Sequence, residues 1–123
     1  MGLGQFAPKK RFFTINRSYS PGMQRFGLVV WTGDIQSSWQ SLQQQPRYLA
    51  NWVLAGVGYI TCDTGGFGDL SNTPDGALLL ARWYQVSLFL PTMRVHSPIN
   101  TQPHFPFLWG PSAGDAMRKA LNL

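Results

Sequence analysis

Acidic residues are scarce in this sequence, which has five aspartates and no glutamate among 123 residues. The net charge of +5 therefore reflects few acids rather than many bases, since the ten lysines and arginines are spread along the chain. The one tight basic cluster, residues 9–11, directly precedes an apolar run and has no interleaved aromatic residues. Nucleic-acid binding needs a basic stripe or patch, so we expect no nucleic-acid partner.

Cysteine and long apolar runs are also lacking. A single cysteine, Cys62, excludes an intrachain disulfide and a cysteine-based zinc site, and its neighbours predict a buried strand position. No run of about 18 apolar residues is present, and Pro8 and the basic residues 9–11 occupy the place where a signal peptide would be apolar. We therefore expect no membrane insertion, and we expect no metal or cofactor.

Hydrophobic and aromatic residues are abundant, at 44% and 14% of the chain, which excludes a disordered protein. Short apolar segments at residues 11–15, 28–31, 57–62 and 92–96 predict four strands, each followed by a helical pattern. Ser37 or Ser38 is expected to cap a helix through Gln45, with Pro46 opening a second helical segment up to Gly56. Thr73 and Pro74 predict the start of another helix, and a last helix begins near Pro111.

Alternating strands and helices predict an α/β fold with a parallel sheet. Four such units are half of a (β/α)8 TIM barrel, which needs about 250 residues. A small doubly wound nucleotide-binding domain is the alternative. It is disfavoured because residues 65–68 form only a short glycine-rich stretch and Pro74 delays the helix that a phosphate loop requires.

Polar residues follow the predicted strands at Arg17, Asp34, Asp63 and His96. The carboxyl ends of parallel strands are where a TIM barrel builds its active site, so these four side chains are expected to share one end of the sheet. Each also has a plain structural role open to it. An aspartate after a strand often forms a turn or caps a helix, and an arginine can simply pair with a carboxylate such as Asp63.

The motif around Asp34 has a known parallel. Residues 31–35 read Trp-Thr-Gly-Asp-Ile, preceded by Arg25-Phe26-Gly27 and followed by Ser37-Ser38-Trp39. This order closely resembles glycoside hydrolase family 31, in which a glycine–aspartate pair ends the sixth barrel strand. Residues 63–67, Asp-Thr-Gly-Gly-Phe, resemble the motif after the family's seventh strand, and residues 16–25, 82–97 and 103–110 resemble other blocks in family order.

The resemblance runs from about Arg11 to Leu123. It implies that residues 1–123 form a segment of the family's catalytic barrel, roughly strands 5–8. The activity implied is that of a retaining, exo-acting α-glycosidase, α-glucosidase-like, acting on an oligosaccharide or other α-glycoside. In such an enzyme one carboxylate attacks the anomeric carbon, while a second protonates the leaving oxygen and then activates water.

Asp34 matches the family's general acid/base. Arg17 and His96 match side chains that hydrogen-bond the sugar, and Asp63 matches an aspartate of the pocket floor. Trp31 and Phe67 could pack on the apolar face of the sugar, and packing in the protein core is an equal alternative for each. A general acid must be protonated when substrate binds. Either burial, for which Trp31 and Phe67 could supply the apolar surroundings, or the charge of the neighbouring nucleophile is expected to keep Asp34 in that form.

One element of the family pattern is absent from the sequence. The family's nucleophile is an aspartate flanked by tryptophan and methionine on the fourth barrel strand, and none of the other four aspartates lies in such a context. The two carboxyl groups of a retaining glycosidase lie about 5–5.5 Å apart. We therefore expect these residues to be inactive alone and to require the missing amino-terminal half-barrel, or another chain supplying it. The alternative is a non-catalytic, sugar-binding or partner-assembled remnant of such an enzyme.

Overall fold

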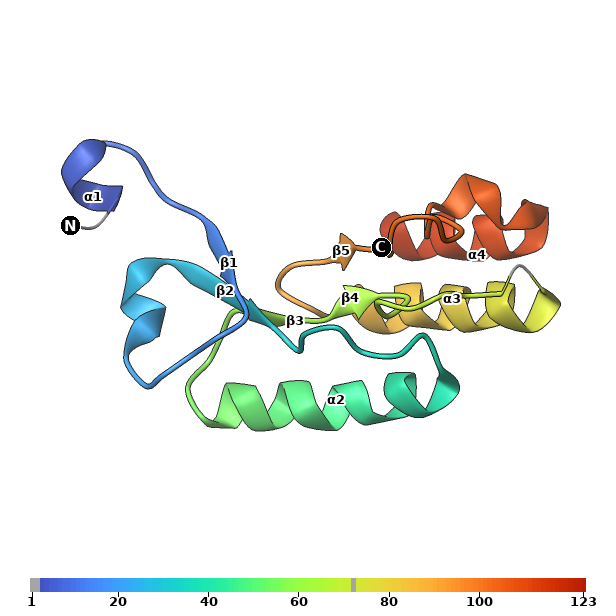
Figure 1. Ribbon diagram of the computed structural model, residues 1–123, viewed down its shortest axis with the longest axis horizontal. Coiled ribbons are helices and arrows are strands. Elements are labelled where there is room, and N and C mark those ends of the chain that lie inside the picture. The colour runs from blue at the N-terminus through green and yellow to red at the C-terminus, as the bar shows by residue number, and fades with distance from the viewer. Residues whose placement is uncertain (1–2, 72) are drawn as a thin grey trace.

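The computed structural model describes residues 3–71 and 73–123, and Figure 1 shows how their helices and strands are arranged. The elements in chain order are α1 (Leu3–Phe6), β1 (Thr14–Asn16), the 3-10 helix η1 (Met23–Phe26), β2 (Leu28–Trp31), α2 (Trp39–Leu54), β3 (Ile60–Thr61), β4 (Asp63–Thr64), α3 (Pro74–Ser87), β5 (Arg94–Val95), the 3-10 helix η2 (Pro106–Leu108) and α4 (Gly110–Leu121).

All strand pairing in the described part of the chain is parallel, as the sequence predicts. One sheet has the order β1-β2-β3, with Thr14 opposite Leu28 and Val30 opposite Ile60. A second sheet pairs β4 with β5, with Asp63 opposite Arg94. Strands alternate with helices along the chain, so the fold is α/β.

The strand predicted over residues 57–62 is wrong in its bounds. Ladder pairing begins only at Ile60, opposite Val30, and the preceding Gly58 and Tyr59 are exposed. The extended stretch then divides at Cys62. Before Cys62, β3 pairs with β2, and after it, β4 pairs with β5. The strand predicted over residues 11–15 begins later too, at Thr14, because its partner β2 begins only at Leu28. The strand predicted over residues 92–96 is confined to β5.

Ser38 and Thr73 cap α2 and α3, respectively. The Ser38 side chain accepts a hydrogen bond from the backbone N–H of Ser41, and the Thr73 side chain accepts one from Gly76. The predicted break at Pro46 is wrong, since α2 runs through it without interruption. Pro46 is exposed, while Leu42, Gln45 and Leu49 of the same helix are buried, so packing on both sides of the proline offsets the lost backbone hydrogen bond.

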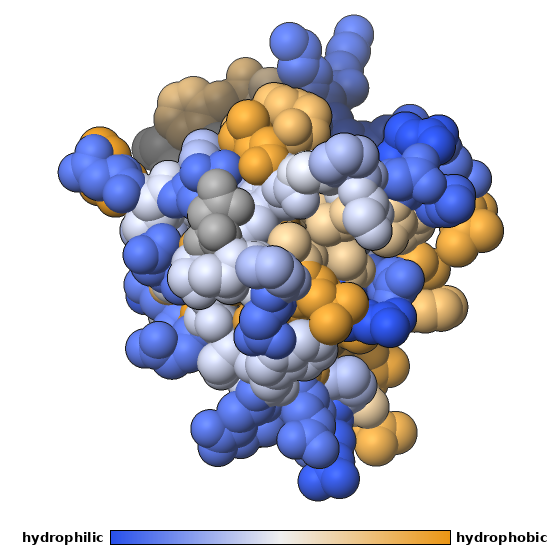
Figure 2. Space-filling view, turned by 90° about the vertical axis from the view of Figure 1, so that its right-hand side faces the viewer, coloured by the Kyte–Doolittle hydropathy of each residue, from blue (hydrophilic) through white to orange (hydrophobic). Residues whose placement is uncertain are grey.

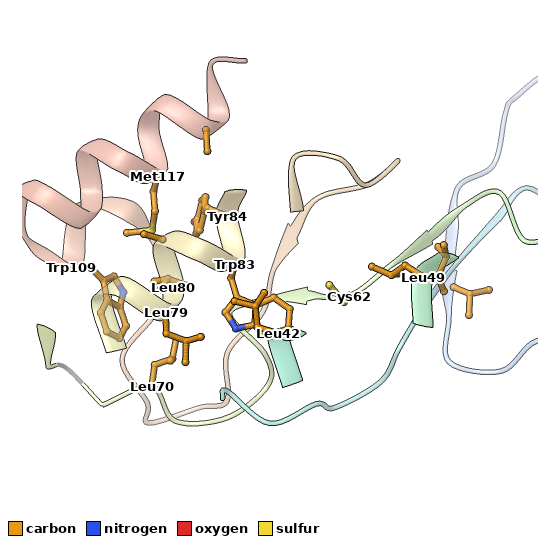
Figure 3. Packing of buried hydrophobic residues seen from close by; sticks show 14 of the residues in the cluster. Leu42, Leu49, Cys62, Leu70, Leu79, Leu80, Trp83, Tyr84, Trp109 and Met117 are labelled. Atoms are coloured by element: carbon orange, nitrogen blue, oxygen red, sulfur yellow. The ribbon is translucent and has the colours of Figure 1, made fainter. Parts of the chain in front are cut away.

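The hydrophobic core lies between the strands and the three long helices (Figure 1). Figure 3 shows Trp83 of α3 close to Leu42 of α2, and Met117 of α4 above Leu80 of α3. Leu28 and Val30 of β2 belong to this core, whereas Trp31 does not. Since side chains alternate across a strand, β2 packs one face on the helices and leaves Trp31 on the opposite face.

Cys62 is fully buried at the junction of the two sheets (Figure 3), as predicted from its neighbours. Burial, together with the charge of the adjacent Asp63, raises the pKa of its thiol to about 12, so the thiol stays protonated at neutral pH. Among the described residues, no helix combines the length and the apolar character needed to cross a bilayer.

Candidate active site

Arg17 and Asp34 form an ion pair beyond the ends of β1 and β2. A guanidinium nitrogen of Arg17 donates to the Asp34 carboxylate at 2.7 Å. The chain reaches Asp34 through Gly33, whose φ of +83° is a left-handed conformation that glycine adopts freely. Both side chains are accessible, with 59% of Arg17 and 41% of Asp34 exposed.

Asp63, Arg94 and His96 form a second polar cluster beside the first. The Asp63 side chain is fully buried, and one of its oxygens accepts a hydrogen bond from Arg94. The other Asp63 oxygen lies 3.4 Å from Nδ1 of His96, and that same nitrogen lies 3.3 Å from Arg94. Asp63 and Arg94 lie opposite each other in the paired strands β4 and β5, and His96 directly follows β5.

Trp31 joins the two polar clusters. The guanidinium carbon of Arg17 lies 5.1 Å from the centre of the Trp31 ring, and that of Arg94 lies 5.3 Å from it. Both are cation–π distances. The indole nitrogen of Trp31 is buried and finds no hydrogen-bond acceptor within the described ranges 3–71 and 73–123.

Phe67 lies on the His96 side of this arrangement. Its ring stacks on the His96 imidazole, with centroids 4.5 Å apart and an interplanar angle of 29°. The backbone N–H of Phe67 donates to the carbonyl of Ile35 at 2.7 Å, which ties the loop after β4 to the loop that carries Asp34. The structure thus brings all six predicted site residues to one region: Arg17, Trp31, Asp34, Asp63, Phe67 and His96.

Two alternatives left open by the sequence are not realised in the structure. Asp34 is not buried among aromatic side chains, because it lies in an open loop and Phe67 stacks on His96 instead. The plain structural role considered for Arg17, an ion pair with Asp63, is not formed, because Arg94 lies directly opposite Asp63 in the sheet and takes that place. The alternation of residues along a strand could have identified Arg94, since positions 94 and 96 must share a face.

A cavity of about 530 Å³ adjoins the Arg17–Asp34 pair. It lies between the loop after β2 and helix α2, and its lining includes Trp31, Gln45 and Tyr48. Asp63 and His96 do not line it, so the four polar residues do not surround this hollow together. Among residues 3–71 and 73–123, no group of three His, Cys, Asp or Glu side chains is placed to hold a metal ion.

His104 supports the loop between β4 and α3. It is buried at 1% exposure, and its Nδ1 lies 3.2 Å from the carbonyl of Thr64, to which it donates as the Nδ1–H tautomer. Burial lowers the pKa of His104 below its usual 6.5, although the hydrogen bond to Thr64 and the charges of Asp63 and Asp69 act in the opposite direction. The folded protein therefore favours the neutral imidazole.

We expect the free energy of unfolding to fall as the pH is lowered from 6.5 to the pKa of His104 in the folded state. Between pH 6.5 and the lower pKa of the folded state, the unfolded chain binds more protons at His104 than the folded chain does. The contribution is complete above pH 6.5 and is lost as the pH falls through the folded-state pKa. Denaturant unfolding from about pH 7 to about pH 5 measures it.

His104→Gln should remove this part of the pH dependence. The control is His96→Gln, because His96 is the other histidine of the sequence and its side chain is 41% exposed. The control should retain the dependence. Equal pH profiles for the original chain and His104→Gln would contradict the assignment.

Comparison with known proteins identifies a family model over the whole chain and relatives over most of it. Residues 1–123 match the model of the glycosyl hydrolases family 31 TIM-barrel domain. Neutral alpha-glucosidase C of Mus musculus is 34% identical over 114 residues, which are 93% of this chain and 12% of the relative. Lysosomal alpha-glucosidase of Bos taurus is 38% identical over 113 residues, 92% of this chain and 12% of the relative. The chain thus spans about one eighth of these relatives.

Solved structures show the same similarity. The glucosidase II alpha subunit with alpha3-Glc2 bound matches 90% of this chain and 12% of that chain, with a TM-score of 0.81 and 32% identity. A family 31 alpha-xylosidase from a soil metagenome, complexed with xylose, matches 97% of this chain and 20% of that chain, with a TM-score of 0.86 and 29% identity.

Proposed function

Because the chain belongs to glycoside hydrolase family 31, we propose that it forms part of the active site of a retaining, exo-acting α-glycosidase. In this proposal Asp34 is the general acid/base, and Arg17, Trp31, Asp63, Phe67 and His96 form part of the sugar pocket. The relatives named alpha-glucosidase and alpha-xylosidase favour an α-glucoside or α-xyloside as substrate. Residues 1–123 then correspond to about four βα units of the barrel, roughly strands 5–8.

The observation that carries the proposal is the Arg17–Asp34 pair at the open end of the sheet. An acid/base must reach both the glycosidic oxygen and water, and the Asp34 side chain is 41% exposed beside the Arg17 guanidinium. A guanidinium offers several donors in a rigid fork, which suits the hydroxyl groups of a sugar. Asp34 is therefore accessible to substrate in a way that the fully buried Asp63 is not.

A second carboxylate has to complete the reaction, since retaining hydrolysis uses one group as acid/base and another as nucleophile. Asp63 is occupied by Arg94 and His96, and Asp115 pairs with Arg118 and Lys119 on α4. Asp75 accepts hydrogen bonds from the Trp39 indole. Asp69 is exposed in the loop between β4 and α3. In our proposal the nucleophile comes from polypeptide outside these 123 residues, which also supplies the rest of the pocket.

Unpaired strand edges support a partner polypeptide. In the described part of the chain, β1 pairs only with β2, and β5 pairs only with β4. A cavity of about 710 Å³ beside β1 is lined by Phe12, Met23 and Phe26, and the Phe26 side chain is 60% exposed. Exposed apolar surface next to a free strand edge, as at β1, is typical of an interface. Figure 2 shows that hydrophobic residues also reach the surface at the opposite end of the molecule, where α4 and the start of α2 lie.

The test is hydrolysis of an aryl α-glucoside and an aryl α-xyloside. The 123-residue chain alone should show no measurable turnover, because one carboxylate cannot form and hydrolyse the glycosyl intermediate. Adding the amino-terminal half of a family 31 barrel, in the same polypeptide or as a separate chain, should produce turnover with retention of anomeric configuration.

Two results would contradict this proposal. Robust turnover by the chain alone would show that it does not depend on an external nucleophile. Inversion of configuration by the completed enzyme would rule out the retaining mechanism. The alternative, a non-catalytic remnant, predicts that the completed protein binds sugar but does not hydrolyse the glycosides.

A further inference from the structure

Arg94 makes contacts with three of the proposed pocket residues at once. Its guanidinium donates to the buried Asp63 carboxylate, lies 3.3 Å from Nδ1 of His96 and lies over the Trp31 ring at 5.3 Å. The Arg94 side chain is only 30% exposed, so these contacts are made largely away from solvent. Arg94 therefore links the Asp63–His96 cluster to the aromatic residue that also contacts Arg17.

We propose that Arg94 is the positioning residue of this sugar pocket, which fixes Asp63, His96 and Trp31 in one arrangement. The inference rests on the proposed function, in which these three side chains contact the sugar. Arg94 acts through them rather than on the reacting atoms, since Asp34 is paired with Arg17 instead.

The shape of the guanidinium matters in this role. A planar fork can donate to Asp63 through one nitrogen while its face lies on an aromatic ring, whereas the compact ammonium group of lysine cannot do both. Charge alone would be enough to compensate the buried Asp63 carboxylate. Replacing Arg94 by lysine thus separates the two roles, because lysine keeps the charge and loses the geometry.

His96 provides a local measure of this positioning. Its ring stacks on Phe67 at 4.5 Å, so nuclear Overhauser contacts between the two rings report where the imidazole lies. The thermal midpoint should fall in Arg94→Gln, and Arg94→Lys should recover most of that fall. If Arg94 fixes His96, the Overhauser contacts should nevertheless weaken in Arg94→Lys. The affinity for glucose or xylose, measured by titration of the same variants in the chain completed with the amino-terminal half-barrel, should weaken about tenfold, the value of one lost charge-assisted hydrogen bond.

Two further variants complete the experiment. Arg94→Gln leaves a buried carboxylate without its cation, so Asp63→Asn combined with Arg94→Gln provides a sample with no buried charge. That double variant should fold and still lose the contacts between Phe67 and His96. Arg82→Gln is the matched control, because Arg82 is exposed on α3 and bonds only Gln85 among the described residues.

The outcomes separate this inference from the proposed function. If Arg94→Lys restores the thermal midpoint, the ring contacts and the sugar affinity together, Arg94 only balances charge and the positioning role is overturned. If the chain completed with the amino-terminal half-barrel binds neither sugar, the pocket assignment in the proposed function fails, and the ring contacts alone decide the role of Arg94.

Discussion

Asp34→Ala in a completed enzyme is expected to lower kcat/KM for a natural disaccharide by about 10²–10⁴-fold, the usual contribution of general acid/base catalysis. The loss should be largest for leaving groups that need a proton. The activated leaving group of an aryl glycoside departs without a proton. The rate of glycosylation of the enzyme by such a substrate should therefore fall much less. The measurement is the ratio of the two losses, taken from steady-state kinetics on both substrates.

Asp115→Ala is the matched control for this experiment. Asp115 has a side-chain exposure of 44%, close to the 41% of Asp34, and it also pairs with an arginine, but it lies on α4 away from the strand ends. Its removal should leave both rates unchanged. Equal losses on disaccharide and aryl substrates for Asp34→Ala would argue that Asp34 is not the acid.

Gly65→Ala is expected to destabilise the fold by about 2–5 kcal/mol, the sum of a left-handed backbone penalty and an overpacked site. Gly65 has a φ of +98°, and a β-carbon there would lie 2.5 Å from Nδ1 of His104 and 2.9 Å from a methyl carbon of Leu80. The side chain of His104 could move only by giving up its hydrogen bond to Thr64. Denaturant unfolding at neutral pH measures the change.

Gly58→Ala is the control, since Gly58 has no positive φ and a β-carbon added there would meet no atom within 4 Å among the described residues. Alanine there reduces the entropy of the unfolded chain and should be neutral or stabilising, by up to about 1 kcal/mol. A similar free energy of unfolding for Gly65→Ala and Gly58→Ala would show that the loop after β4 is free to shift.

Local features of the sequence were enough to predict the helix starts and to bring the polar residues together. Ser37 or Ser38, and Thr73 with Pro74, predicted the starts of α2 and α3 because a capping hydroxyl or an amino-terminal proline acts within one turn of the chain. The polar residues after each apolar run predicted that Arg17, Asp34, Asp63 and His96 gather at one end of one parallel sheet. The structure gathers them in one region but divides the strands between two parallel sheets.

Tertiary packing decided the points at which sequence reasoning failed. Pro46 did not break α2, because the buried residues on either side of it hold the helix. The stretch around Cys62 became two strands because each half pairs with a different neighbour, and the sequence of one strand does not contain its partners.

The ion-pair partners were also a tertiary outcome. By itself the sequence determined which residues carry charge and which face of a strand each occupies. Only the register of β4 against β5, which places Asp63 opposite Arg94, and the open loop after β2 decided that Asp63 pairs with Arg94 and Asp34 with Arg17. The physical reason is that an ion pair acts over a few ångströms, and distances on that scale between separate strands are set by the folded chain.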